Sequence, residues 1–321
     1  MTESHGTTVA DNWDYLEIHG TDGDDHLVVP ANDYWNYVEA YTGSDLIEVD
    51  AGNTGHVVIW LDDGGDTIHG GPGAERMSIT SETKIENVEF HGGAGDDLVS
   101  FLGPGPGLGE GNFLDGGAGK DSFYGDGRGV FVHLENGTAL VGLENELGVF
   151  YEMPILNFED ATGGLGHDIL VGKEGGNLLS GSWGDDLLSG HGGTDRLEGG
   201  PGDDILVGGH GADGLESNEG ADIIRIDRLV ESLPGQEDTI IDFTFRDAID
   251  LSRIDADLTT AGDQAFAFVG TADFSGSAGE LRYEVQGEDL LVSADADSDS
   301  VADLAVKVRD LAQLAASDFI L

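Results

Sequence analysis

The chain has 321 residues, of which 53 are glycine, 64 are aspartate or glutamate and only 13 are lysine or arginine, so its formal net charge is −51. Such a negative chain repels phosphate backbones and anionic lipid surfaces, and the absence of cysteine excludes disulfides and thiolate sites. No apolar run is long enough to span a membrane, and the first residues lack the basic and apolar regions of a secretory signal peptide. The abundance of Asp and Gly predicts turns and strands, and the carboxylates suggest a divalent cation as counter-ion.

Residues 1–129 repeat a Gly-Asp turn at irregular spacing, with GGAGDDLVS at 92–100 as one of the better copies. In GGPGAERMS the acid is Glu75 instead of Asp. The Asp residues of the other turns are Asp25, Asp45, Asp66, Asp97 and Asp121. Their separations of 20, 21, 31 and 24 residues predict an irregular right-handed β-solenoid with one long coil per turn. Whether each of these turns binds calcium or is a plain turn stays open.

Residues 130–162 carry VFVHLENGTA and LNFEDATGG, which predict connecting strands that enter the following array. The preceding GPGPGLGEG at 103–111 is rich in Pro and Gly, which disfavour strand pairing. We interpret it as a surface loop, with a flexible linker between two domains as the alternative.

Residues 163–225 divide without a gap into seven repeats of nine residues. They read GGLGHDILV, GKEGGNLLS, GSWGDDLLS, GHGGTDRLE, GGPGDDILV, GGHGADGLE and SNEGADIIR. Position four is always Gly, and position eight is Leu in six repeats and Ile in the seventh. Position six is occupied by Asp168, Asn177, Asp186, Asp195, Asp204, Asp213 and Asp222.

These columns have a direct physical interpretation. Glycine allows positive φ and close backbone approach, so positions one to six predict a tight turn, and positions seven to nine predict a short strand with position eight inward. Two repeats make one coil of 18 residues, so every second position-six side chain is stacked on its neighbour. The stacked pairs are Asp168/Asp186, Asn177/Asp195, Asp186/Asp204, Asp195/Asp213 and Asp204/Asp222. Stacked carboxylates repel each other, and Ca²⁺ between coils would take oxygens from Asp and from backbone carbonyls.

The motif GGxGxDxUx resembles the nonapeptide of RTX proteins, which implies a calcium-filled parallel β-roll. The alternative is that these acids only form turns. The expected metal residues are therefore the seven at position six, together with Asp25, Asp45, Asp66, Asp97 and Asp121. The site with Asn177 has one charge fewer and is expected to bind calcium more weakly.

Residues 226–321 show ordinary alternation in stretches such as 238–255, 279–285 and 289–295, which predict strands. The run as a whole resembles the C-terminal region of serralysin-type metalloproteases and related type I secreted proteins. The resemblance implies a β-rich cap on the open end of the roll, which would otherwise expose its core and unpaired strand edges.

The segment DADSDSVAD spaces its acids as in the first part of an EF-hand loop. These acids are Asp295, Asp297, Asp299 and Asp303. Ser300 stands where that loop needs Gly, and Val306 stands where it needs a bidentate Glu. A calcium site and a solvated acidic hairpin are both open interpretations.

The last residues are Asp318, Phe319, Ile320 and Leu321. An acidic residue followed by three apolar residues resembles the type I secretion signal of the serralysin group. The alternative is an ordinary terminal strand that docks on the cap, and the two are compatible.

No enzymatic motif is identifiable in the sequence. None of the ten histidines is followed by Glu, so the H-E-x-x-H helix of serralysins is absent, and no G-x-S-x-G motif occurs. His167, His191 and His210 lie at variable turn positions and are expected to face solvent, with a transition-metal site as the minor alternative. A glycan-active enzyme could use acids such as Asp24, Asp25, Asp62, Asp63 and Asp66 near Trp13, Trp35 and Trp60. The simpler interpretation assigns these acids to turns and these aromatic residues to covering the core.

Together these features predict an all-β protein, a parallel β-roll or β-solenoid with a C-terminal β-rich cap, secreted by a type I exporter and folded by several Ca²⁺ ions. We expect an extracellular location, with attachment to a cell surface left open. The alternative function is a glycan-binding adhesin or a polysaccharide-active enzyme, whose partner would be an extracellular polysaccharide. No nucleic acid and no transmembrane segment are expected.

Overall fold

The computed structural model describes residues 7–9, 15–61, 64–80, 86–102, 111–125, 130–142 and 150–321. The chain forms two compact units, Met1–Gly166 and His167–Leu321. The first contains the segments 1–129 and 130–162, and the second contains most of 163–225 and all of 226–321. Among the described residues, no helix has the length and apolar character needed to cross a bilayer.

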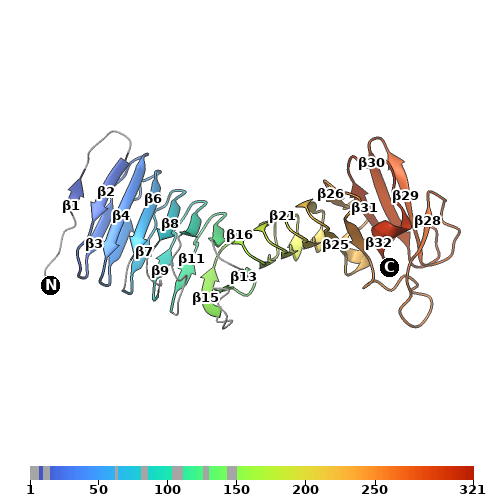
Figure 1. The fold of residues 1–321 in the computed structure, drawn as a ribbon, viewed down its shortest axis with the longest axis horizontal. Coiled ribbons are helices and arrows are strands. Elements are labelled where there is room, and N and C mark those ends of the chain that lie inside the picture. The colour runs from blue at the N-terminus through green and yellow to red at the C-terminus, as the bar shows by residue number, and fades with distance from the viewer. Residues whose placement is uncertain are drawn as a thin grey trace. The chain divides into compact units, whose positions relative to one another are not determined.

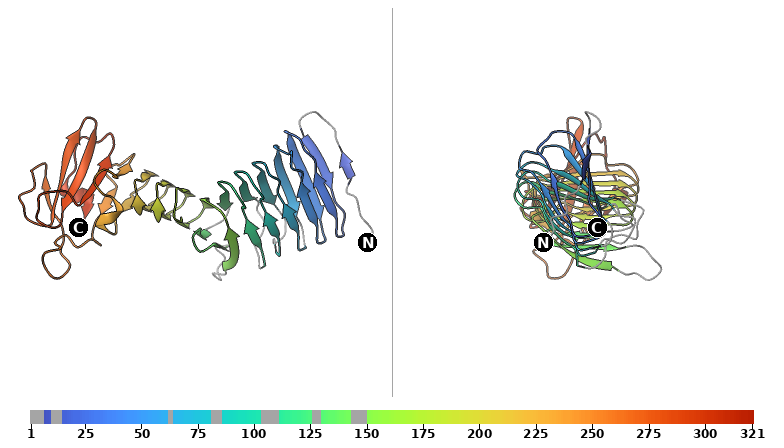
Figure 2. Two further views of the ribbon diagram at one scale, coloured as in Figure 1. Left: turned by 180° about the vertical axis from the view of Figure 1, so that it is seen from behind. Right: turned by 90° about the vertical axis from the view of Figure 1, so that its left-hand side faces the viewer.

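Unit 1 is built from short strands that lie side by side in two facing sheets (Figures 1 and 2). The strands of the first sheet are β1 (Thr7–Val9), β2 (Tyr15–His19), β4 (Trp35–Tyr41), β6 (His56–Leu61), β8 (Arg76–Thr80), β10 (Leu98–Leu102), β12 (Ser122–Gly125) and β16 (Asp160–Leu165), in that spatial order. The strands of the second sheet are, in spatial order, β3 (His26–Val29), β5 (Leu46–Val49), β7 (Thr67–His69), β9 (Glu89–His91), β11 (Phe113–Asp115), β15 (Phe150–Leu156), β14 (Thr138–Gly142) and β13 (Val130–His133).

Each coil of unit 1 contributes one strand to each sheet, so strands that are neighbours in space are parallel. The residues pair in register; in the second sheet Ile47 faces Ile68, and Ile68 faces Phe90. These side chains are buried, as are inward-facing residues of the first sheet such as Val57 and Ile59. The hairpins β1–β2, β13–β14 and β14–β15 are antiparallel instead. Alternating inward and outward residues therefore place the core between the two sheets.

Unit 2 begins with the roll of nine-residue repeats. Its strands are β17 (Ile169–Val171), β18 (Leu178–Trp183), β19 (Leu187–Ser189), β20 (Gly192–Gly193), β21 (Arg196–Pro201), β22 (Ile205–Val207), β23 (His210–Gly211), β24 (Gly214–Glu219) and β25 (Ile223–Arg225). Repeats alternate between two sheets, with β17-β19-β22-β25 on one side and β18-β21-β24 on the other. The position-eight side chains from Leu170 to Ile224 are buried. The predicted all-β parallel solenoid is thereby confirmed.

The remaining elements of unit 2 close the roll. They are the 3₁₀ turn η1 (Leu229–Glu231), the strands β26 (Asp238–Ile240), β27 (Ala248–Asp250), β28 (Ala267–Gly270), β29 (Glu280–Gln286), β30 (Asp289–Asp295) and β31 (Leu304–Val308), the turn η2 (Ala316–Asp318) and β32 (Phe319–Ile320). β26 pairs with β24 and β31, and β27 pairs with β25 and β32, so each roll sheet is extended. β29, β30 and β31 form an antiparallel meander. Strands from the C-terminal segment thus cover the end of both roll sheets.

Candidate calcium sites

The position-six side chains of unit 2 form two continuous ladders along the roll. In each step a backbone N–H donates to the Oδ1 of the residue 18 positions later, as from Asp168 to Asp186 at 2.7 Å and from Asp186 to Asp204 at 2.8 Å. The same contact joins Asn177 to Asp195 and Asp195 to Asp213 on the other edge, both at 2.8 Å. The pairs of position-six residues that the nine-residue period predicted are therefore stacked in the structure.

Both ladders continue beyond Arg225, where the sequence interpretation ended the repeat. Asp213 donates its backbone N–H to Asp238 Oδ1 at 3.0 Å, and Asp222 donates to Asp247 Oδ1 at 3.1 Å, each across 25 residues. Both added acids are buried and lie two residues before a buried isoleucine. This Asp-x-Ile pattern matches positions six to eight of the repeat. It could have identified these two ladder residues in the sequence, but the change of coil length from 18 to 25 residues obscured it.

Unit 1 has the same construction, with its acids divided between two ladders. Asp25 donates its N–H to Asp45 Oδ1 at 2.8 Å, and Asp45 donates to Asp66 Oδ1 at 3.0 Å. These three acids precede the strands β3, β5 and β7 of the second sheet. They form one ladder along one edge.

The second ladder of unit 1 lies before strands of the first sheet. Glu75 donates its N–H to Asp97 Oδ1, and Asp97 donates to Asp121 Oδ1, both at 2.8 Å. Asp121 then donates to Glu159 Oε2, also at 2.8 Å. The long interval from Asp66 to Asp97 is thus a switch between edges. Glu75, which stands in its turn in place of Asp, is a ladder residue, although it was not among the expected metal residues.

The ladder carboxylates are removed from water yet only partly satisfied. Asp186 is 3% exposed and Asp204 is 1% exposed. Within the part of the chain that the structure describes, the second carboxylate oxygen of several ladder residues is buried without a hydrogen-bond partner. These residues are Asp45, Asp66, Asp121, Asp186, Asp204 and Asp213. A buried, unsatisfied carboxylate oxygen is costly, so each one marks a place where a cation would be stabilising.

Burial also raises the pKa values of these groups, because it disfavours the charged form. The pKa of Asp186 is raised to about 6, and burial together with the charges of Asp186 and Asp222 raises that of Asp204 to about 7. Burial raises the pKa of Glu75 to about 8, with a contribution from the neighbouring Asp97. Neutralisation of these three carboxylates, by protons or by metal, is therefore favoured.

The glycines bring backbone oxygens up to the ladders. At position one, a Cβ on Gly181 would collide with the Oδ2 of Asp186. At position four, Gly202 has φ of +153°, and a Cβ there would collide with the carbonyl oxygen of Gly184 in the previous coil. A Cβ on Gly220 would contact both the carbonyl oxygen of Gly202 and, at 2.5 Å, the Oδ1 of Asp222. Carbonyl and carboxylate oxygens thus converge between coils.

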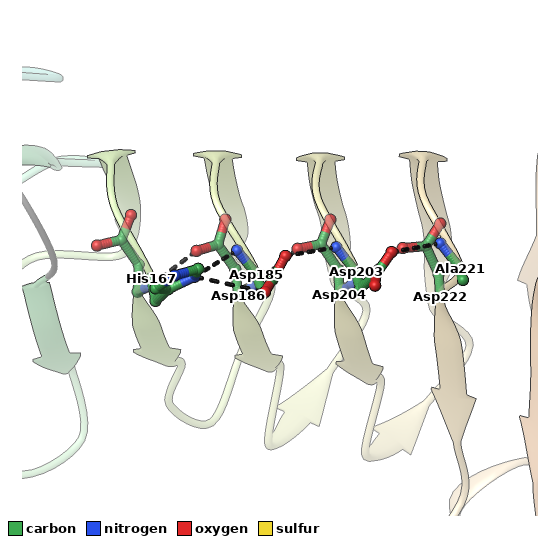
Figure 3. Close-up of polar contacts among 8 residues, drawn as sticks. His167, Asp185, Asp186, Asp203, Asp204, Ala221 and Asp222 are labelled. Atoms are coloured by element: carbon green, nitrogen blue, oxygen red, sulfur yellow. Dashed lines mark hydrogen bonds and ion pairs between the residues drawn. The ribbon is translucent and has the colours of Figure 1, made fainter.

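A further ladder runs through position five on one edge of the roll (Figure 3). Asp185 donates its backbone N–H to His167 Nδ1 at 2.7 Å, Asp203 donates to Asp185 Oδ1 at 2.9 Å, and Ala221 donates to Asp203 Oδ1 at 2.9 Å. The direction is opposite to that of position six, because here the later coil donates. His167 is exposed, as the sequence predicted, whereas the two acids, which occur only in every second repeat, were not singled out from the sequence.

These features fit Ca²⁺. The converging groups are all oxygens, and Ca²⁺ takes 6–8 oxygen ligands from carboxylates and backbone carbonyls. The position-six acids would supply the carboxylate oxygens, and the turn glycines would supply the carbonyls. The chain has no cysteine, so no thiolate ligand exists, and no histidine lies at position six of the nine-residue repeats.

The acidic loop between β30 and β31 is a separate candidate. Asp295, Asp297 and Asp303 offer oxygens that lie within 4.8 Å of one another, whereas Asp299 is outside this group and accepts the N–H of Val301 at 2.7 Å. Asp295 is buried, and both of its oxygens accept backbone N–H groups from the loop. The loop closes on itself, so this geometry accounts for a hairpin without a cation.

The other predicted positions are dispersed. Trp35 and Trp60 are 47% and 43% exposed on the outer face of unit 1, so they do not cover the core. Asp24 accepts the N–H of Ser44 at 3.0 Å in a position-five contact. Asp62, Asp63 and Trp13 lie outside the described residues.

The remaining histidines and the last residues also have defined places. His191 and His210 are exposed, as expected. Phe319 is buried, and Ile320 pairs with Asp250 in β27, while Asp318 ends the η2 turn. The terminal residues therefore form a docked strand, which is compatible with either predicted role.

Comparisons with known proteins agree with this architecture. Residues 140–321, more than half of the chain, match the serralysin C-terminal family of M10 peptidases, and residues 42–74 match the RTX calcium-binding nonapeptide repeat. No match is found among curated proteins.

Two solved structures are similar to parts of this chain. The solution structure of the AlgE6R3 subunit of the Azotobacter vinelandii mannuronan C5-epimerase is 26% identical, covering 47% of this chain and 80% of that chain with a TM-score of 0.35. The extracellular lipase LipA from Serratia marcescens is 15% identical, covering 84% of this chain but only 45% of that chain with a TM-score of 0.22. RTX and serralysin-type proteins are typically secreted. The chain belongs to the serralysin C-terminal family and carries RTX calcium-binding repeats.

Proposed function

We propose that several calcium ions bound between successive coils drive the folding of this protein outside the cell. The observation that carries the proposal is the second carboxylate oxygen of residues such as Asp186 and Asp204, which is buried and lacks a hydrogen-bond partner within the described residues. A cation between coils would satisfy this oxygen together with the nearby glycine carbonyls. Because such a site exists only when two coils are stacked, its binding free energy becomes folding free energy.

Without calcium, two costs oppose folding. Ordering a chain with 53 glycines loses much conformational entropy, and the net charge of −51 makes the compact state repel itself. Extracellular calcium modules have Kd values of about 10⁻⁴–10⁻³ M, so they would be empty in a low-calcium cytoplasm and occupied outside. The chain would then stay unfolded until it has been exported.

Export would use a type I exporter that recognises the C-terminal segment Asp318–Leu321. A host carrying such an exporter provides the test, with full-length chain and a chain lacking these four residues. We expect the truncated chain to remain inside the cells. A double substitution, Phe319→Ser with Ile320→Ser, keeps the full length of the chain. It therefore shows whether the exporter needs these apolar side chains or only a chain of the right length. Equal secretion of all three chains would contradict the proposal. Folding of the secreted chains, checked by circular dichroism, shows whether loss of the β27–β32 pairing alone explains a defect.

A second candidate function is binding of an uncharged extracellular polysaccharide by unit 1. Trp35, Tyr37 and Trp60 are exposed on strands of one sheet, and sugar rings stack on such aromatic side chains. Glu39 lies on β4 with Trp35 and Tyr37, and Glu17 lies on the neighbouring strand β2, so their charge disfavours an acidic polysaccharide. Affinity electrophoresis in gels containing neutral or acidic polysaccharides tests this. Retardation by a neutral polysaccharide that Trp35→Ala with Trp60→Ala abolishes would support it, and unchanged mobility in every gel would reject it.

A further inference from the structure

The second sheet of unit 1 carries a row of metal-ligating side chains on its outer face, apart from the calcium ladders. Four adjacent strands place Glu48, His69, His91 and Asp115 in register, since Glu48 pairs with His69, His69 with His91, and His91 with Asp115. The residue before each of these in its strand is buried in the core. Strand alternation therefore directs all four side chains outward.

The two imidazoles lie at a separation that suits a shared metal ion. Their ring centroids are 5.3 Å apart, with an interplanar angle of 68°. Two imidazoles on one tetrahedral Zn²⁺, with Zn–N distances of about 2.0–2.1 Å, have centroids roughly 5 Å apart. Parallel pairing of β7 and β9 fixes this spacing, because the two histidines occupy the same register position.

A carboxylate lies beside the pair. Glu48 Oε1 is 4.0 Å from His69 Nδ1, and the other oxygen, Oε2, is 2.6 Å from His26 Nε2. On the far side of His91, Asp115 Oδ1 accepts an N–H from the Asn157 side chain at 2.7 Å, so this carboxylate already has a partner. The side chains of Glu48, His69 and His91 are 44%, 47% and 40% exposed. They can therefore adjust to an ion that arrives from solvent without disturbing the core.

The ligands of this row favour a different class of metal ion from the class that the calcium ladders favour. Imidazole nitrogens suit zinc, copper and nickel, whereas Ca²⁺ prefers oxygen ligands throughout. We propose that Glu48, His69 and His91 bind one divalent first-row transition ion of the Zn²⁺ type, with water completing the coordination. The site shares no residue with the position-six ladders, so it is filled while calcium occupies those ladders.

Zinc binding to the full chain in excess calcium tests the proposal. We expect isothermal titration calorimetry to detect one Zn²⁺ site that the double substitution His69→Gln with His91→Gln weakens at least tenfold. The matched control is His19→Gln, because His19 lies on the opposite sheet with Glu39 Oε2 2.8 Å from its Nδ1, and no other histidine of the described residues contacts it. This control should keep the affinity of the unaltered chain.

Cobalt binding supplies a second measurement that does not rely on calorimetry. Co²⁺ held by nitrogen and oxygen ligands in a tetrahedral site gives a visible absorption band, which the double variant should lose and the control should keep. Far-UV circular dichroism of both variants in calcium verifies the fold. Equal zinc affinity in the unaltered chain and the double variant, or a cobalt band that survives in the double variant, would overturn the proposal. Loss of zinc binding in His19→Gln to the same extent would overturn it as well.

Discussion

Asp204 accepts the backbone N–H of Asp186 through Oδ1 at 2.8 Å, while its Oδ2 is buried with no hydrogen-bond partner in the described part of the chain. The two oxygens of this carboxylate thus have different roles. Oδ1 fixes the register of two coils, and Oδ2 remains available to a cation between them. This division recurs along the ladders, and it separates the hydrogen-bonding role of the side chain from its charge.

Asp204→Asn tests this division directly. The amide keeps an oxygen that can accept the N–H of Asp186 but removes the charge. Because Asp204 lies between Asp186 and Asp222 in the ladder, we expect calcium affinity to fall roughly tenfold or more at the sites on both sides, since affinity follows the charge of the ligands. Calorimetric titration with calcium measures the effect.

The neighbouring residue is the matched control. Asp203→Asn keeps the oxygen that accepts the N–H of Ala221 and also removes one charge, but at the exposed position five. Its calcium affinity should change much less. Equal losses in the two variants would mean that overall charge, and not the ladder carboxylate, governs binding.

Asn177→Asp should strengthen calcium binding. Asn177 occupies position six and donates its backbone N–H to Asp195 Oδ1, so the backbone arrangement is already that of an aspartate site. Adding a carboxylate supplies the charge that this site lacks. We expect a higher calcium affinity, and a thermal midpoint in calcium that rises by a few degrees. An unchanged midpoint at every calcium concentration would show that no ion binds beside residue 177.

Gly202→Ala should destabilise the roll strongly. The added Cβ would collide with the carbonyl oxygen of Gly184, and φ of +153° is unfavourable for alanine. We expect a loss of about 3 kcal/mol or more in the free energy of unfolding in calcium, measured by chemical denaturation. Gly214→Ala is the control, because a Cβ there has its nearest neighbour at 3.8 Å, an ordinary contact. Similar losses in the two variants would contradict the close approach of coils at position four.

The strict nine-residue period made the roll predictable, because Gly, Asp and Leu columns specify turn, ladder and core at once. Features that break the period were missed for physical reasons. The ladders reach Asp238 and Asp247 through coils of 25 residues, and only the stacked structure reveals that the turn is preserved. In unit 1, Glu75 replaces Asp, which concealed the change of edge after Asp66. The register of Glu48, His69 and His91 depends on coil lengths that vary from turn to turn, so the sequence alone does not align them.

The stability of the calcium-free chain should depend on pH in the direction opposite to that of most proteins. Burial raises the pKa of Asp45, Asp66 and Asp186 to about 6, above the value of about 3.9 expected in an unfolded chain. The folded state then binds protons more tightly. Its stability is greatest below about pH 4 and is lost as the pH rises through about 6, with Asp204 extending the loss to about 7.

Thermal unfolding in buffers freed of calcium by a chelating resin, from pH 4 to pH 8, checks this dependence. We expect the midpoint to rise steadily as the pH is lowered across the window from about 7 to about 4. In saturating calcium the thermal midpoint should depend less on pH above pH 6, because the calcium ion replaces the protons on these carboxylates. A midpoint that rises with pH in the calcium-free chain would contradict the raised pKa values.

The most direct measurement of calcium-driven folding is thermal unfolding at pH 7.5, followed by far-UV circular dichroism, in millimolar calcium and in excess EGTA. Each ion at ten times its Kd adds about 1.4 kcal/mol to stability, so ions at the five stacked pairs of the roll would together add about 7 kcal/mol, as much as the whole stability of many folded proteins, which is about 5–15 kcal/mol. We therefore predict a cooperative transition in calcium, its loss together with most of the β signal in EGTA, and full recovery when calcium is restored. A β signal and thermal midpoint that EGTA leaves unchanged would contradict the proposal that calcium drives folding.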